Sequence, residues 1–181
     1  MTIQFTYMRT PLYRFTFKNR RIREWVEKHC EGYVLNLFAG ETKLNVHEVR
    51  NDLRGDMPCD YHMDALDLVL EWKKWIEYDQ FRKFDTILLD PPYAYRKSME
   101  MYDGAVSSPF NQLKNNILDI IAPQGIVITF GYHSNVMGMN RGFNQEHILL
   151  MSHGGAIHDT IAVIERLDDG CLTKDEVGAF F

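Results

Sequence analysis

The sequence lacks any apolar run long enough to cross a membrane and any N-terminal stretch typical of a signal peptide. A membrane-spanning helix needs about 20 predominantly apolar residues, and the first residues, Met1–Thr6, have neither a basic start nor an apolar core. The three cysteines, Cys30, Cys59 and Cys171, are odd in number and widely spaced, which argues against a disulfide framework or a zinc site. The seven histidines show no metal-ligand spacing. We therefore expect a cytoplasmic protein with no membrane segment and no metal.

Linkers rich in proline or glycine, internal repeats and low-complexity stretches are also missing. The 181 residues, 45% of them hydrophobic and 25% charged, are enough for one domain with its own apolar core. We expect a single domain over residues 1–181, of which residues 1–31 form a basic N-terminal segment and a helix.

Positive charge is scarce in most of the chain but concentrated at its start. The net charge is −5, yet residues 1–30 carry +5 and the remainder carries −10. A basic segment on an acidic body could contact phosphates and orient a nucleic-acid strand. A solvated helix face explains the same charges equally well.

Hydrophobic periodicity predicts strands that alternate with helices. Three- and four-residue apolar spacing predicts helices, and short apolar runs bounded by turn residues predict strands. The predicted helices cover residues 18–30, 65–78 and 109–121, and the predicted strands cover residues 33–38, 46–50, 60–63, 84–89, 125–130, 146–151 and 159–165.

This pattern predicts an α/β fold built on a doubly wound, Rossmann-like sheet. Near-continuous apolar strands separated by helices are typical of a parallel sheet covered on both faces. The segment between the last two strands is too short for a crossover helix, so these strands should form an antiparallel pair at one sheet edge. The expected sheet is mostly parallel with an antiparallel C-terminal strand.

A small-residue turn follows the first predicted strand. The segment Asn36-Leu37-Phe38-Ala39-Gly40-Glu41 begins where that strand ends, and ligands of open parallel sheets bind beyond such ends. Ala39 and Gly40 leave the backbone bare, so a nucleoside can approach it closely. The dinucleotide fingerprint GxGxxG is missing, which weakens an oxidoreductase interpretation. Asn36, Phe38, Ala39, Gly40 and Glu41 are the candidate cofactor-binding residues of this turn.

Acidic residues after the next two predicted strands are candidates for contacts with a nucleoside. A carboxylate accepts two hydrogen bonds from a vicinal diol, as a ribose presents. Asp52 is the first choice for this role and Glu48 is its competitor. Asp64 and Ala65 suit an adenine ring, with the carboxylate on the exocyclic amine and the alanine on the ring face. Asp64 is equally suited to cap the helix that follows.

The strongest motif is Asp90-Pro91-Pro92-Tyr93, at the end of the apolar strand 84–89. Two prolines remove two backbone donors and leave carbonyl groups free to accept hydrogen bonds. A carboxylate followed by two prolines at a buried strand end is costly to maintain for packing alone. We therefore predict that Asp90, Pro91, Pro92 and Tyr93 form a catalytic centre.

This tetrapeptide resembles the fourth motif of class I S-adenosylmethionine-dependent amino-methyltransferases, (D/N/S)PP(Y/F/W). The turn at Phe38-Ala39-Gly40 resembles their glycine-bearing first motif FxGxG, although Glu41-Thr42-Lys43 replaces its second glycine. The resemblance spans roughly residues 7–166. It implies S-adenosyl-L-methionine as the cofactor and an exocyclic amine of a nucleic-acid base as the methyl acceptor.

The resemblance implies roles for the motif residues and for the loop after them. The Asp90 carboxylate and the Pro91 carbonyl accept the two hydrogens of the amine, and Tyr93 stacks on the base. The loop 94–108 could close over a flipped base, with Tyr95, Arg96 and Lys97 as candidate substrate-binding residues. Thr6–Tyr13 lies where adenine methyltransferases carry a segment that flanks the methionine.

The motifs leave open whether the substrate polymer is DNA or RNA. The resemblance favours adenine N6 in DNA by a small margin over RNA, in which adenine N6 or guanine N2 is the alternative target. Because no separate target-recognition domain is evident, a homodimer or a specificity partner would suit a DNA enzyme. A non-catalytic partner subunit that keeps the methyltransferase fold is a further alternative.

Overall fold

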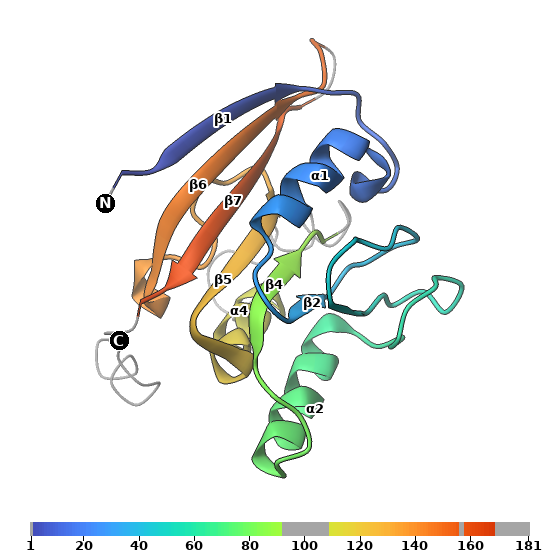
Figure 1. Cartoon of the computed structure of the whole chain (residues 1–181), viewed down its shortest axis with the longest axis vertical. Coiled ribbons are helices and arrows are strands. Elements are labelled where there is room, and N and C mark those ends of the chain that lie inside the picture. Colours follow the sequence, from blue (N-terminus) through green and yellow to red (C-terminus); the bar gives the residue numbers. More distant parts are fainter. Residues whose placement is uncertain (1, 92–108, 156–157, 169–181) are drawn as a thin grey trace.

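The central feature of the protein is one twisted β-sheet. The computed structural model describes residues 2–91, 109–155 and 158–168, which form a seven-stranded sheet in the order β1-β6-β7-β5-β4-β2-β3 (Figure 1). The strands are β1 (Gln4–Arg9), β2 (Val34–Asn36), β3 (Glu48–Arg50), β4 (Phe84–Leu89), β5 (Ile121–Gly131), β6 (Phe143–Ser152) and β7 (Thr160–Leu167).

Strand β7 runs against both of its neighbours, and the other strand pairs are parallel. The predicted parallel sheet with an antiparallel C-terminal strand is therefore confirmed. The prediction that β6 and β7 lie at the edge was wrong, because β1 pairs in parallel with β6 and forms the edge itself. Strand β1 was not predicted from the hydrophobic periodicity.

The strand predicted at residues 60–63 does not form. This segment keeps a single parallel bridge between Tyr61 and Asn51. The polar residues Asp60 and His62 leave it without the apolar row that a further strand would need to bury on both faces.

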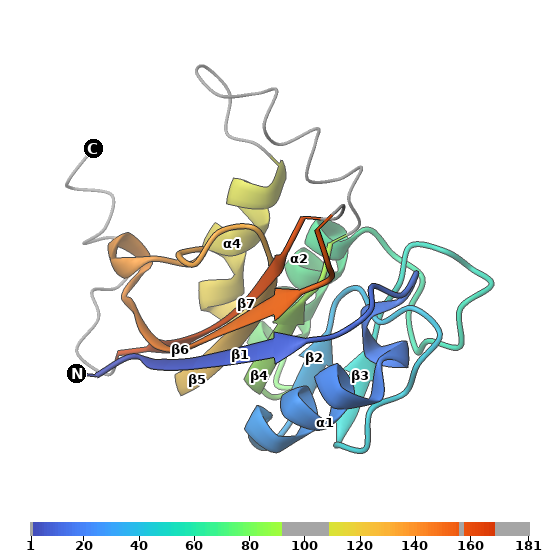
Figure 2. The same cartoon turned by 90° about the horizontal axis from the view of Figure 1, so that it is seen from above.

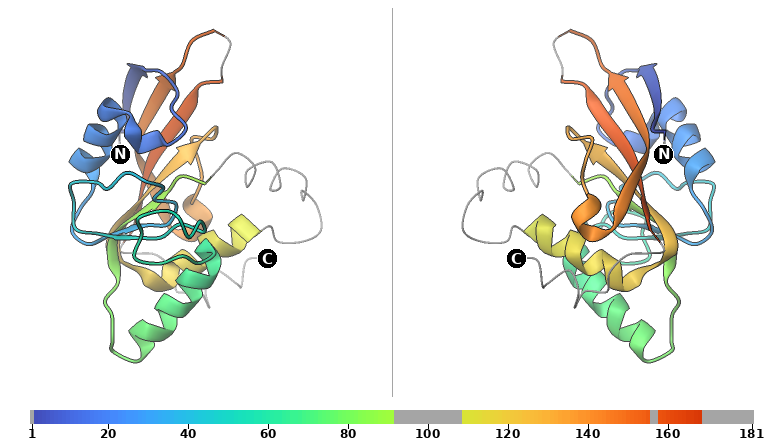
Figure 3. Two further views of the ribbon diagram at one scale, coloured as in Figure 1. Left: turned by 90° about the vertical axis from the view of Figure 1, so that its right-hand side faces the viewer. Right: turned by 90° about the vertical axis from the view of Figure 1, so that its left-hand side faces the viewer.

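Helices cover the two faces of the sheet. Helix α1 (Arg20–His29), preceded by the short helix η1 (Thr16–Lys18), lies on one face, and α2 (Ala65–Glu77) and α4 (Pro109–Ile120) lie on the other (Figures 2 and 3). Ile22 and Trp25 of α1 belong to the same core cluster as Leu88 of β4, whereas Leu68 of α2 and Ile87 of β4 belong to the other. The alternation along β4 therefore divides the core into two layers.

Two connections within the described chain cross without an α-helix. Residues 37–47 lead from β2 to β3 as an irregular loop, and residues 132–142 lead from β5 to β6 with only the short helix η2 (Met139–Arg141). No helix follows β2 directly, so contacts from side chains hold the loop after it.

Candidate cofactor and substrate site

A cavity of about 750 Å³ opens at the carboxyl ends of β2 and β4. The chain changes direction across the sheet at this point. Strand β3 follows β2 on one side, and the next strand along the chain, β4, lies on the other side of β2. Open α/β sheets bind their ligands in the crevice at such a switch point. Volumes of about 300–1,000 Å³ are typical of small-molecule sites.

The turn after β2 forms one wall of the cavity. Phe38, Ala39 and Gly40 line it. Gly40 has a φ of +57°, and a Cβ atom there would lie 2.8 Å from Cδ1 of Phe15. Only glycine therefore fits this position without strain or collision. The small-residue turn predicted from the sequence is present at the cavity.

The other two residues predicted from this turn lie elsewhere. Asn36 is buried inside β2 and donates a hydrogen bond from Nδ2 to Oε2 of Glu48, at 3.2 Å. Glu41 forms an ion pair with Lys18. Neither residue is among the described residues that line the cavity.

The structure separates the two acidic residues that competed for the ribose position. Asp52 lines the cavity, and its two carboxylate oxygens accept the backbone N–H groups of Gly40 and Arg54, each at 3.0 Å. Glu48 has a fully buried side chain behind the loop and is not among the lining residues. Burial raises the pKa of the Glu48 carboxyl. The geometry therefore favours Asp52 for contact with a ligand.

Asp64 and Ala65 line the cavity beside this wall. Asp64 also caps α2, since its Oδ1 accepts the Leu66 N–H at 2.9 Å, which confirms the predicted cap, while the contact with an adenine ring stays a prediction. Asn51, which was not predicted as a site residue, also lines the cavity. Its side chain donates to the carbonyls of Leu37 (3.2 Å) and Met63 (3.0 Å) and thereby joins the two walls.

The end of β4 supplies the catalytic candidates. Asp90 and Pro91 line the same cavity as Gly40 and Asp52. The structure therefore brings the carboxylate of the fourth motif and the first-motif turn to one space. The remaining predicted residues of this region, Pro92, Tyr93, Tyr95, Arg96 and Lys97, lie outside the described residues.

Most of the far wall of the cavity was missed from the sequence. It includes residues 12–17 before α1, of which only the first two belong to a predicted segment, Tyr132 directly after β5, and His158 and Thr160 at the start of β7. The rings of Tyr132 and His158 lie 6.1 Å apart at an interplanar angle of 70°. Because β7 is antiparallel, its first residues meet the carboxyl ends of the parallel strands. Strand direction would have identified the residues after β5 and at the start of β7, had the sheet order been known.

The segment predicted to flank the methionine, Thr6–Tyr13, is divided by the structure. Leu12 and Tyr13 line the cavity, whereas Thr6 to Arg9 belong to β1. The lining continues through Arg14 and Phe15, beyond the predicted segment. Arg14 is exposed and stacks on the ring of Phe15, so it places positive charge at the rim.

No metal cluster or membrane helix is found among the described residues. No group of three or more His, Cys, Asp or Glu side chains there could hold a metal ion. No helix in the same part of the chain is long and apolar enough to span a bilayer.

Comparison with known proteins connects this architecture to methyltransferases. The chain matches no protein-family model and no curated protein sequence. It is similar to the solved structure of a candidate SAM-dependent methyltransferase from Streptococcus mutans, with 16% identity over 82% of this chain and 48% of that one and a TM-score of 0.51. The structure of SMU.776 complexed with SAH gives 16% identity over 82% and 49%, and also a TM-score of 0.51.

A third similar structure is the N-methyltransferase NodS from Bradyrhizobium japonicum WM9. It shares 11% identity over 82% of this chain and 96% of its own, with a TM-score of 0.50. The chain spans about half the length of the first two structures. These likenesses, together with the strand order, show that the chain has the α/β Rossmann-like methyltransferase fold.

Proposed function

We propose that this chain is an S-adenosylmethionine-dependent methyltransferase that methylates an exocyclic amine of a nucleic-acid base, with adenine N6 in DNA as the first choice. One observation carries the proposal. Asp90 and Pro91, at the end of β4, share a single cavity with Gly40 and Asp52, at the ends of β2 and β3. A methyl donor and an acceptor amine must meet in one enclosed space.

The residues of the first wall fit the cofactor. Asp52 would accept hydrogen bonds from the ribose hydroxyls, and Asp64 would accept one from the adenine amine. Leu53 is 71% exposed and lines the cavity next to Asp52, where it offers an apolar surface to the adenine ring. The bound cofactor would supply an electrophilic methyl group on a sulfonium sulfur. The similar fold of SMU.776, which was solved with SAH, supports this assignment.

The second group of residues fits the acceptor. An exocyclic amine of a base is a weak nucleophile because its lone pair is delocalised into the ring. The Asp90 carboxylate and the Pro91 carbonyl would accept its two hydrogens, which favours a tetrahedral nitrogen and frees the lone pair. A new nitrogen–carbon bond forms as the methyl group leaves sulfur, and the surplus proton of the amine passes to Asp90 or to water. Positioning supplies most of the rate.

Two features of the rim support a nucleic-acid substrate. Tyr132 and His158 place aromatic rings in the cavity that Asp90 also lines, where a base could stack. Arg14 adds an exposed cation at the mouth, and Tyr13 beside it is an exposed aromatic. Exposed aromatics interleaved with arginine are typical of surfaces that bind single strands or flipped bases.

The decisive experiment is transfer of a tritiated methyl group to four polymers. Duplex DNA, single-stranded DNA, tRNA and rRNA are incubated with the protein and labelled S-adenosylmethionine, and the labelled nucleoside is then identified. We expect N6-methyl-2′-deoxyadenosine from DNA. Label in RNA as N6-methyladenosine or N2-methylguanosine would establish the alternative substrate. Binding of the cofactor without transfer to any polymer would instead favour a non-catalytic partner.

A further inference from the structure

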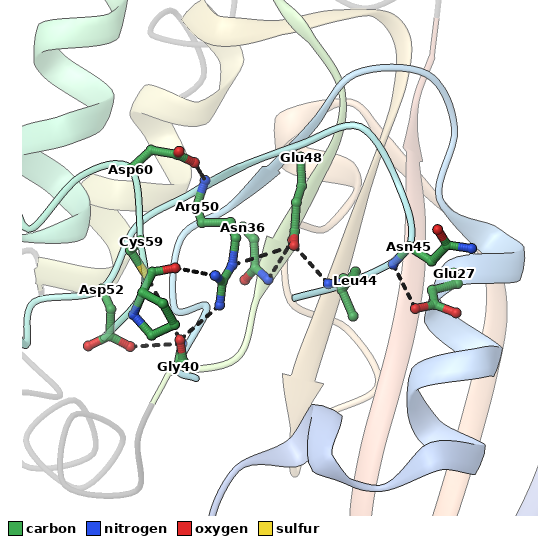
Figure 4. A network of polar contacts seen from close by, with 11 residues as sticks. Glu27, Asn36, Gly40, Leu44, Asn45, Glu48, Arg50, Asp52, Cys59 and Asp60 are labelled. Atoms are coloured by element: carbon green, nitrogen blue, oxygen red, sulfur yellow. Dashed lines mark hydrogen bonds and ion pairs between the residues drawn. The ribbon is translucent and has the colours of Figure 1, made fainter. Parts of the chain in front are cut away.

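A buried arginine lies behind the turn that forms the first wall. Arg50, the last residue of β3, has a side chain that is only 6% exposed. Its Nη2 donates to the carbonyl of Gly40 at 3.0 Å, and its Nη1 donates to the carbonyl of Pro58 (Figure 4). One guanidinium thus joins the turn after β2 to the segment that precedes α2.

The charge of this arginine is balanced from within the same strand. Nε of Arg50 lies 3.5 Å from Oε1 of Glu48, whose side chain is fully buried. Glu48 in turn accepts the backbone N–H of Leu44 at 2.8 Å and the Asn36 amide at 3.2 Å. The pair therefore contacts the loop 37–47 at two points, Gly40 and Leu44 (Figure 4).

The Gly40 residue is held from two sides. Asp52 accepts its N–H at 3.0 Å, and Arg50 donates to its carbonyl at 3.0 Å. This residue has a left-handed backbone and contacts Phe15 too closely to carry a side chain. Both polar groups of Gly40 are thus fixed by side chains from the end of β3.

A purely structural role explains this network poorly. Replacing a buried ion pair with apolar residues of similar volume is often neutral or stabilising, so the pair is weak evidence of a contribution to folding. What the ion pair can do and an apolar pair cannot is hold carbonyl groups at defined positions. The planar guanidinium does this with several donors in fixed directions. The loop 37–47, all of it described, has no helix that could fix the turn instead.

We propose that Arg50, with Glu48, is a positioning residue for cofactor binding: it fixes the Gly40 turn, and with it the Asp52 carboxylate, in the geometry that receives the nucleoside. The inference rests on the proposed function, since it assigns this task toward S-adenosylmethionine. Arg50 itself lies behind the cavity wall and acts through Gly40 and Asp52.

The test compares Arg50→Lys with a matched control, Arg166→Lys. Lysine keeps the charge and the partner Glu48 but cannot donate to two carbonyls in fixed directions. Arg166 also forms ion pairs, with Glu31 and Glu146, and donates to the carbonyl of Gln124, and it is not among the described lining residues of the cavity. Binding of S-adenosylhomocysteine is measured by calorimetry on the full chain, and thermal unfolding is measured alongside.

We expect Arg50→Lys to raise the Kd for S-adenosylhomocysteine by roughly tenfold, a change of about 1.4 kcal/mol. The KM for the cofactor should rise in parallel, while kcat and the KM for the nucleic acid stay near their wild-type values. Arg166→Lys should bind as the wild type does, even where it lowers the Tm. A split between cofactor affinity and turnover is not expected from general loosening of the fold.

A second variant covers the case in which Arg50→Lys does not fold. Glu48→Gln keeps a side chain of the same shape but removes the charge that balances Arg50, and it should raise the Kd by about threefold, a change of less than 1 kcal/mol. Wild-type affinity in the folded Arg50 or Glu48 variant would overturn the inference, as would an equal loss in Arg166→Lys. If the wild type itself binds no cofactor, the proposed function fails, and this result is distinct from either outcome.

Discussion

The two ends of the sheet are built from different interactions. At the β2–β3 end, buried polar side chains hold an irregular loop, and Arg50, Glu48, Asn51 and Asp52 bond to backbone groups. At the β1–β6–β7 end, apolar residues form rows across the strands. Phe5 lies beside Ile148, which lies beside Val163, and Tyr7 likewise continues into Leu150 and Ile161.

The two ends of the sheet should therefore differ in how well they tolerate substitutions. A hydrogen bond between a buried side chain and a backbone group requires distances and angles within narrow limits. A strand ladder with an apolar face tolerates changes on its open side. Ile3, Phe5 and Tyr7 are 44%, 65% and 59% exposed, so the outer face of β1 contributes little to the core. Substitutions at the β2–β3 end should therefore impair function. Substitutions in β1 should have an effect only on the face that packs against α1.

The largest expected effect is that of Asp90→Ala. Loss of the acceptor for the amine should reduce kcat by at least about a thousandfold, while the Kd for S-adenosylhomocysteine stays within about threefold. Asp67→Ala, an exposed carboxylate on α2, is the control and should leave both values unchanged. Wild-type turnover in Asp90→Ala would refute the catalytic assignment.

Substitution of Gly40 should lower both the stability of the fold and the affinity for the cofactor. Gly40→Ala places a Cβ atom 2.8 Å from Phe15 at a φ of +57°. A left-handed backbone alone costs about 1–2 kcal/mol for a residue with a side chain, so the free energy of unfolding in urea should fall by at least that much. Gly55→Ala is the matched control, because nothing lies within 4 Å of its Cβ position. Equal effects at the two positions would contradict the tight approach of Phe15.

Neighbouring residues of β1 test the other end of the sheet. Met8 is buried against the α1 side, whereas Tyr7 points to the open side. Met8→Ala should lower the free energy of unfolding by about 2–4 kcal/mol, and Tyr7→Ala should change it by less than about 0.5–1 kcal/mol. A comparable loss in Tyr7→Ala, growing with protein concentration, would show that a second copy covers this face.

The smallest expected effect concerns pH. Burial raises the pKa of Glu48 above its ordinary value of 4.5, although hydrogen bonds from Leu44 and Asn36 and the charges of Arg50 and Lys43 oppose the shift. Burial and the charge of Glu48 in turn raise the pKa of the Cys30 thiol. The folded state therefore binds the Glu48 proton more tightly than the unfolded state, and ionisation lowers stability as the pH rises through the raised pKa. The free energy of unfolding of the wild type should increase relative to Glu48→Gln as the pH falls toward 4.5. A difference that is constant with pH would contradict the shift.

Elements with strong local signals were predicted well from the sequence. The strand over Phe84–Leu89 is present as expected, and α2 covers Ala65–Glu77 where a helix over residues 65–78 was predicted. The short strand β1 was missed because Phe5 and Tyr7 are apolar on an exposed face, so that alternation gives no inward side. Sequence periodicity predicts that the apolar face of a strand is buried, and in β1 the face with the two aromatic residues is the exposed one.

Local chemistry could be predicted from neighbouring residues. The turn at Ala39-Gly40 and the carboxylate with a proline at Asp90-Pro91 are of this kind, because turn residues and strand ends depend on residues close in the chain. That these two segments share one cavity with Tyr132 and His158 depends on the strand order, which is a non-local property and emerges only in the folded chain. The tertiary structure also decided that Glu48 faces Arg50 behind the loop while Asp52 reaches the cavity. Glu48 and Asp52 are four residues apart and look equivalent in sequence. Because β3 ends between them, Glu48 lies buried in the strand and Asp52 lies in the loop that lines the cavity.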